Sequence, residues 1–189
     1  MYDAVNDDGE RYTATWTVTG EDEEGDGDSF IVEVSFVPPL SGPTGDIATA
    51  QARMDKTSHL LVEMQIAGKM GGEPALILQQ VAYEFSPTSL WPLEAGKEVA
   101  VAETTTVMSR VGTQEPETEA EMKTSMYKVE SVEGITVKAG TFECYRIEEY
   151  DHSGERLSTK WHSDKVKTDV KTVDYKTGET TELISYSVR

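Results

Sequence analysis

Cysteine is almost absent from this chain of 189 residues, where Cys144 stands alone. A single thiol cannot form an internal disulfide, and no zinc site can be built from cysteines around it. Cys144 falls in an alternating run beside Phe142 and Arg146, so we expect it to pack as a small apolar side chain. Long apolar runs are also missing. No stretch reaches the ~18 residues of a membrane-spanning helix, so we expect no transmembrane segment.

Basic residues are scarce relative to acidic ones. The chain has 17 Lys and Arg residues against 35 Asp and Glu residues, a formal net charge of −18 at pH 7. A field of that sign repels nucleic acid phosphates and anionic lipid heads, so we expect no nucleic-acid partner. It favours cations as counter-partners, although solubility alone also accounts for such an excess.

Histidine is rare, and the common catalytic motifs are missing. His59, His152 and His162 show no paired spacing of the His-Glu-x-x-His kind, and no Gly-x-Ser-x-Gly motif occurs. We therefore favour a non-enzymatic role. The alternative is a hydrolase that uses carboxylates which the sequence does not single out.

Short alternating segments recur along the whole chain. Residues 11–19 alternate apolar side chains with threonine, and residues 30–36 alternate again after an acidic loop. This period of two is typical of strands with one buried face. We expect an all-β fold: an antiparallel β-roll, or a barrel-like or sandwich sheet, with long hairpins and at most a short helix. The expected organisation is a flexible N-terminal tail over residues 1–10 and a single β domain over residues 11–189.

Residues 46–69 are ambiguous. Their Ala, Gln and Met content and a rough apolar stripe are compatible with a helix. They also alternate twice, on either side of the polar break Asp55-Lys56-Thr57-Ser58, as the two strands of a hairpin do. We choose the hairpin.

Turn signals divide the last third of the chain. Asp151–Glu155 and Lys176–Glu179 each place polar residues before Gly-Glu, and glycine there can take the left-handed turn position. A closing strand is expected from Leu183 to Val188.

The same region carries a resemblance. The run over residues 137–147, with an Ala-Gly-Thr-Phe turn before Cys144, resembles uncharacterised envelope or secreted β-domains of bacteria and archaea, many of them lipoproteins. Residues 161–163 and 182–186 are similar to later strands of these domains of unknown function, and 91–97 to an upstream Pro-Leu-x-x-Gly-Lys element. The similarity lies mainly in the C-terminal half. The resemblance implies a β-roll or barrel. It also implies an extracytoplasmic location, with the protein secreted or anchored through a removed N-terminal segment. It assigns no catalytic residues.

An acidic segment over residues 22–33 follows the spacing of a calcium loop. Carboxylates stand at places one, three, five, seven and twelve and glycine at six, as oxygen ligands around Ca²⁺ require. The candidate ligands are Asp22, Glu24, Asp26, Asp28 and Glu33. The flanking segments read as strands, so a solvated hairpin tip is the competing interpretation. No other cofactor is predicted.

Large aromatic residues could line a concavity of a rolled sheet, although such residues are also typical of a core. The candidates for a ligand pocket are Trp16, Trp91, Tyr145, Trp161 and Tyr186. The sequence thus favours a cell-envelope binding or scaffold domain that holds a small apolar ligand or a partner protein. A calcium-binding structural domain is a further alternative, and the oligomeric state is open.

Overall fold

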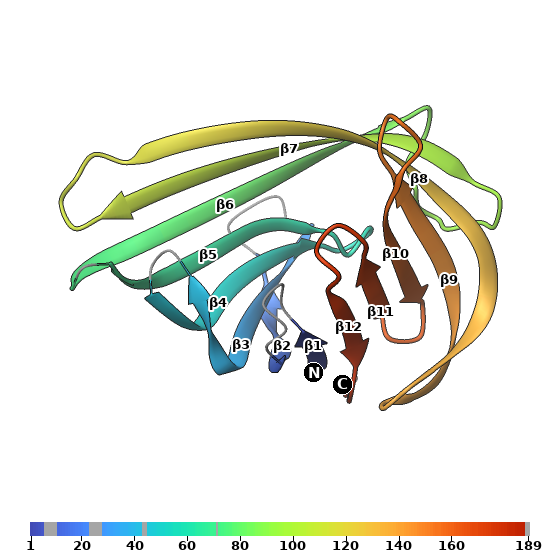
Figure 1. Ribbon diagram of the computed structural model, residues 1–189, viewed down its shortest axis with the longest axis horizontal. Helices are drawn as coiled ribbons and strands as arrows, with labels where there is room; N and C mark the ends of the chain where they lie inside the picture. The colour runs from blue at the N-terminus through green and yellow to red at the C-terminus, as the bar shows by residue number, and fades with distance from the viewer. Residues whose placement is uncertain (6–10, 23–27, 43–44, 71, 188–189) are drawn as a thin grey trace. The chain divides into compact units, whose positions relative to one another are not determined.

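The computed structural model describes residues 1–5, 11–22, 28–42, 45–70 and 72–187. Within these ranges there is no helix, and twelve strands are hydrogen-bonded in the order β1-β12-β11-β10-β9-β8-β7-β6-β5-β4-β3-β2, which closes as a barrel (Figure 1). The expected all-β, barrel-like class with long hairpins is confirmed. In the described part of the chain there is also no helix long and apolar enough to cross a membrane.

The strands follow one another with short connections. The first six are β1 (Tyr2–Val5), β2 (Arg11–Glu21), β3 (Ser29–Gly42), β4 (Gly45–Asp55), β5 (Leu61–Met70) and β6 (Glu73–Ser86). The last six are β7 (Glu98–Val111), β8 (Glu117–Val137), β9 (Gly140–Tyr150), β10 (Arg156–Ser163), β11 (Thr168–Asp174) and β12 (Thr180–Leu183).

The strands are divided between two compact units. The first unit comprises residues 1–13, 84–102 and 124–189, and the second comprises residues 14–83 and 103–123. Each unit has a hydrophobic cluster of its own. The candidate functional site described below belongs entirely to the first unit.

The second unit is built around the β3–β4 ladder. Val34 lies opposite Ala50 and Val32 opposite Ala52, and these four side chains form a buried cluster. The chain turns after Asp55, and β5 pairs back onto β4 with Ala52 opposite Met64. The hairpin expected over residues 46–69 is therefore confirmed. Alternating apolar residues share one face of a strand, whereas in a helix they would be spread around its circumference.

Pro38 and Pro39 lie within β3 and do not end it. β3 continues to Gly42, and the peptide bond before Pro38 is cis. The two prolines fall where the ladder with β4 changes register, between Ser35 and Leu40. Proline is tolerated there, because an irregular stretch of ladder does not need its missing N–H.

The first unit has its core at one end of the β8–β9 hairpin. Val137, Phe142, Cys144, Val170 and Leu183 are buried together. Burial of this kind is the main stabilising contribution to such a sheet.

Residues 2–5, which were expected in a flexible tail, form β1. This strand pairs antiparallel with β12, with Tyr2 opposite Leu183, so the two terminal strands lie side by side (Figure 1). Ala4 is buried, and Tyr2 donates to or accepts from Thr168 at 2.7 Å between hydroxyl oxygens. The tail prediction failed for these residues because their partner strand is almost 180 residues away in sequence.

The closing strand lies earlier in the chain than expected. β12 is Thr180–Leu183, residues 184–187 belong to no strand, and Val188 lies outside the described residues. The partner of β12, β1, begins at Tyr2, and the backbone N–H of Ile184 already bonds the carbonyl of Met1, 2.9 Å away. The Met1 amino group also donates to the carbonyl of Ser185 from 2.9 Å.

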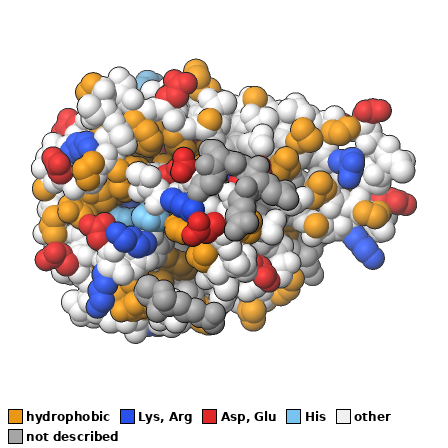
Figure 2. Space-filling view, turned by 180° about the vertical axis from the view of Figure 1, so that it is seen from behind, with side chains coloured by type: hydrophobic (Ala, Val, Ile, Leu, Met, Phe, Trp, Pro, Cys, Tyr) orange, Lys and Arg blue, Asp and Glu red, His pale blue; other side chains and the backbone are white. Residues whose placement is uncertain are grey.

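Surface charges are paired locally. Figure 2 shows acidic and basic side chains interspersed among apolar ones on one face of the molecule. In the first unit Lys171 Nζ lies 2.8 Å from Glu182 Oε1, and in the second Arg53 Nη2 lies 2.6 Å from Asp22 Oδ2. Because acids outnumber bases two to one, such pairs leave a large negative excess.

Candidate ligand-binding cleft

An open cleft of about 520 Å³ lies in the first unit, over strands β7 and β8 and the turn between β9 and β10. On β8, Thr124, Met126 and Lys128 line it, together with the buried Ser125, and Met126 and Lys128 alternate with the buried Tyr127 and Val129. Successive side chains of a strand point to opposite faces, so the cleft covers the face turned away from Tyr127 and Val129.

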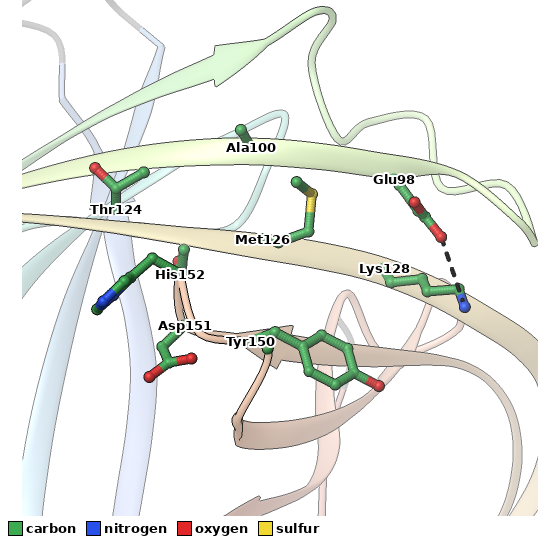
Figure 3. Close-up of a pocket in the computed structure, with 10 residues that line it drawn as sticks. Glu98, Ala100, Thr124, Met126, Lys128, Tyr150, Asp151 and His152 are labelled. Carbon is green, nitrogen blue, oxygen red and sulfur yellow. Dashed lines mark ion pairs between the residues drawn. The ribbon is translucent and has the colours of Figure 1, made fainter.

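Strand β7 contributes to the cleft in the same way. Glu98 and Ala100 line it, and they alternate with Val99 and Val101, each 1% exposed. Figure 3 shows Ala100 and Met126 in the middle of the cleft, with Thr124 and His152 at one end and the Glu98–Lys128 pair at the other. The cleft therefore has an apolar middle and polar ends.

The β9–β10 turn closes the cleft below these strands. Asp151 Oδ1 accepts hydrogen bonds from the backbone N–H of Ser153 (2.8 Å) and of Glu155 (2.9 Å) and from the Ser153 hydroxyl (2.7 Å). Gly154 has φ of 84°, a conformation that side chains with a Cβ rarely adopt. The turn expected from Asp-His-Ser-Gly-Glu is confirmed, and it places Tyr150, Asp151 and His152 against the cleft.

The charged residues of the cleft are held in defined places. Lys128 Nζ lies 2.8 Å from Glu130 Oε1 and 3.5 Å from Glu98 Oε1, and the bond to Glu130 raises the pKa of the lysine. Hydrogen bonds from Ser153 and from the turn backbone lower the pKa of Asp151. Asp151 is therefore ionised at neutral pH, and one lysine is shared by two carboxylates.

A buried carboxylate supports the floor of the cleft beside Tyr150. Glu148 is 3% exposed, and Arg146 and the hydroxyl of Tyr150 donate to its two oxygens, while Arg156 Nη1 donates from 2.9 Å. Burial alone would raise the pKa of Glu148, but the bonds from Tyr150 and the two arginines outweigh burial and lower it. The Glu148 carboxylate therefore fixes the position of the Tyr150 side chain.

The family model of the DUF3108-like domains matches residues 49–188, which is well over half of the chain. The chain belongs to the DUF3108-like family. The resemblance to an uncharacterised family of domains of unknown function is thus confirmed at that level. The match also begins earlier than expected, since the sequence had shown little similarity before about residue 90.

Among solved structures, this DUF3108-like chain is similar to a crystal structure from Bacteroides fragilis NCTC 9343 described as a "putative exported protein with YmcC-like fold". The two are 9% identical, the similarity covers 99% of this chain and 93% of that one, and the TM-score is 0.35. A likeness this remote supports no conclusion about the present chain. No match was found among curated proteins.

The five aromatic residues proposed for a pocket are dispersed in the DUF3108-like chain. Trp16 packs against the Val32 and Val34 cluster of the second unit. In the first unit, Trp161 packs against the Phe142 cluster and Trp91 meets Phe85 edge-on, with ring centroids 6.1 Å apart.

The other two aromatic candidates also lie in the first unit. The Tyr186 ring lies 5.5 Å from the Phe142 ring, centroid to centroid. Tyr145 lines a smaller cleft of about 170 Å³ beside Cys144 and Ser163. None of the five candidates lines the larger cleft, whose aromatic side chain is Tyr150.

The calcium-loop candidates lie partly outside the described residues, which include neither Glu24 nor Asp26. Asp22 forms an ion pair with Arg53, and Glu33 lies opposite Gln51 in the β3–β4 ladder. In the ranges that the structure describes, no three His, Cys, Asp or Glu residues are grouped so as to hold a metal ion. The calcium loop stays a prediction.

Cys144 is a core residue of this DUF3108-like chain. It is 1% exposed, and burial raises the pKa of its thiol to about 11. The thiol is therefore protonated at neutral pH. This suits a packing role, because a nucleophilic cysteine reacts as the thiolate.

The residues that sequence reasoning missed are Glu98, Ala100, Met126 and Lys128. Their signal is the alternation of 98–101 and 124–129, which marks one exposed and one buried face. The sequence does not show that the two exposed faces and the Asp151 turn lie around one cleft.

Proposed function

We propose that this DUF3108-like chain is a non-enzymatic binding domain that holds a small, partly apolar ligand in the cleft between β7, β8 and the β9–β10 turn. The observation that carries the proposal is the exposed thioether of Met126, 41% exposed, inside a cleft of about 520 Å³. Ligand sites commonly enclose roughly 300–1,000 Å³ and combine an apolar lining with a few fixed polar groups.

Met126 suits such a role. Methionine is flexible and polarisable, and it is common on surfaces that bind varied apolar partners. Ala100, whose side chain is a single methyl group, lines the same cleft from β7 (Figure 3). An apolar chain seated between them would remove both side chains from water, which is favourable.

A binding role is favoured over catalysis because the polar groups of the cleft serve structural contacts. Lys128 is shared by Glu98 and Glu130, the Tyr150 hydroxyl donates to Glu148, and Asp151 Oδ1 holds the turn. These contacts support a rigid frame of charges that orients a ligand.

The experiment is calorimetric titration of the full chain with 1-octanol, as a neutral apolar probe. The wild-type protein is expected to give saturable binding of one equivalent. Ala100→Phe, which fills the cleft from β7, is expected to abolish it. Ala120→Phe is the control, because Ala120 is exposed on β8 outside the cleft. A wild-type protein that shows no saturable heat, or an Ala100→Phe protein that binds as tightly as wild type, would refute the proposal.

We also propose an extracytoplasmic location, supported by the resemblance of residues 137–147 to envelope β-domains. Reading the native gene upstream of Met1 tests it. A signal peptide with a lipid-attachment cysteine is the expected result, and a cytoplasmic fusion partner in the same frame would contradict it.

A further inference from the structure

We infer that the cleft selects a small amphiphilic cation, with its apolar chain against Met126 and Ala100 and its positive head beside Asp151. This inference rests on the proposed function and adds the charge and the orientation of the ligand. It follows from how the charges of the cleft are distributed.

The carboxylate of Asp151 keeps one oxygen outside the turn. The three hydrogen bonds that the turn donates to its side chain all end on Oδ1. Oδ2 takes no part in them, while Asp151 as a whole lines the cleft. An ionised oxygen at the wall of a cleft is a counter-charge for a ligand cation.

Besides Ser153 and the turn backbone, His152 also acts on Asp151 and lowers its pKa. The single lysine of the lining, Lys128, lies at the end formed by Glu98, and it is also bonded to Glu130 (Figure 3). Two carboxylates therefore share this one positive charge. The net charge around the cleft is negative, as is that of the whole chain at −18. Clefts lined by one sign of charge concentrate ligands of the opposite sign.

Tyr150 offers a second attraction for a cation inside the cleft. It precedes Asp151 in the chain, its ring extends away from the Asp151 carboxylate toward Lys128, and its hydroxyl donates to Glu148 (Figure 3). A cation near an aromatic face is attracted to the ring, and quaternary ammonium groups are recognised in this way.

The test compares three probes that share one octyl chain: octyltrimethylammonium, 1-octanol and octyl sulfate. Affinities for the full chain are measured by calorimetry at low salt. The expected order is the cation first, about tenfold tighter than the alcohol, with the sulfate weakest. Equal affinity for the cation and the alcohol would overturn this inference while leaving the proposed function in place. Absence of binding by all three would overturn both.

Asp151→Asn isolates the charge. The amide oxygen of asparagine can still accept the bonds of the turn, so the backbone should keep its conformation. Octyltrimethylammonium is expected to bind about threefold to fivefold more weakly, with 1-octanol unchanged. The matched control is Asp174→Asn, since Asp174 Oδ1 accepts from Lys176 and Thr177 in the β11–β12 turn, outside the cleft.

A second variant, at a position outside the β9–β10 turn, tests the same charge effect in case Asp151→Asn disturbs folding. Glu98→Gln removes one of the two carboxylates that share Lys128, and it is expected to weaken the cation in the same direction. Unchanged affinity for octyltrimethylammonium in both Asp151→Asn and Glu98→Gln would contradict the inference.

Discussion

Met126 of β8 and Tyr150 of β9 lie directly opposite each other in the antiparallel ladder, and both line the same cleft. Opposed side chains on one face of a sheet are neighbours. This register brings an exposed thioether beside a ring fixed by a buried carboxylate. It defines one apolar surface to which residues far apart in the chain contribute.

Met126→Gln should weaken binding of 1-octanol by about threefold to tenfold, because the ligand chain then covers an amide that loses its water. Calorimetric titration measures the change. Met122→Gln is the matched control on the same strand, since Met122 is 71% exposed and does not line the cleft. Equal weakening in both variants would show that the effect is not local to the cleft.

Glu148→Gln should lower the free energy of unfolding by about 1–3 kcal/mol. The buried carboxylate accepts from Arg146, Arg156 and Tyr150, and the variant leaves both guanidinium groups without their counter-charge. Urea unfolding followed by circular dichroism measures it. Glu143→Gln, an exposed position on the same strand, should stay within about 0.5 kcal/mol of wild type. A Glu148→Gln protein as stable as that control would contradict the account of the network.

The same carboxylate predicts sensitivity to acid. The pKa of Glu148 is lower in the folded protein than its ordinary value of 4.5. Its contribution to stability is therefore complete above pH 4.5 and is lost as the pH falls below that value through the folded pKa. The stability difference between wild type and Glu148→Gln should be full at neutral pH and smaller at roughly pH 3. A difference that grows on acidification would reverse the assigned sign.

Cys144 should resist alkylation in the native protein. Its thiol pKa is raised from 9.0 to about 11, so near neutral pH the thiolate fraction is about a hundredfold lower than in the unfolded chain. The rate of iodoacetamide labelling, with and without urea, is followed by mass spectrometry. Labelling as fast in buffer as in urea would show that the thiol is not buried as described.

Gly154→Ala should destabilise the protein by about 1 kcal/mol, because φ of 84° strains any residue with a Cβ. Gly134→Ala provides the comparison. A Cβ there meets nothing within 4 Å and the backbone is extended, so its effect should be neutral or stabilising. Thermal unfolding measures both, and a Gly154→Ala protein with wild-type stability would rule out the positive φ.

The sequence predicted well those features that depend on neighbours in the chain. Alternation predicted the β class, and the polar break at Asp55–Ser58 predicted the hairpin of β4 and β5, because both are local patterns. The turn at Asp151–Glu155 is likewise encoded by its own aspartate and glycine.

Features that depend on distant partners could not be derived in this way. The pairing of Tyr2 with Leu183 made a strand out of an expected tail, and the register shift between Val129 and Ser131 decides which β8 side chains oppose those of β9. The aromatic residues proposed for a pocket are mostly packed against the cores, because their size alone does not show which face they occupy. Met126 was missed because the sequence does not show which residues lie beside an exposed methionine. Its neighbours in the cleft, Ala100 and Tyr150, are distant in the chain.

The most direct test of the binding role is a titration of ¹⁵N-labelled protein with 1-octanol, monitored through backbone amide shifts. The account predicts saturable shifts at Ala100, Met126 and Tyr150, with Val34 and Ala50 of the second unit unmoved. Shifts that never saturate, or that centre on residues outside the cleft, would contradict it.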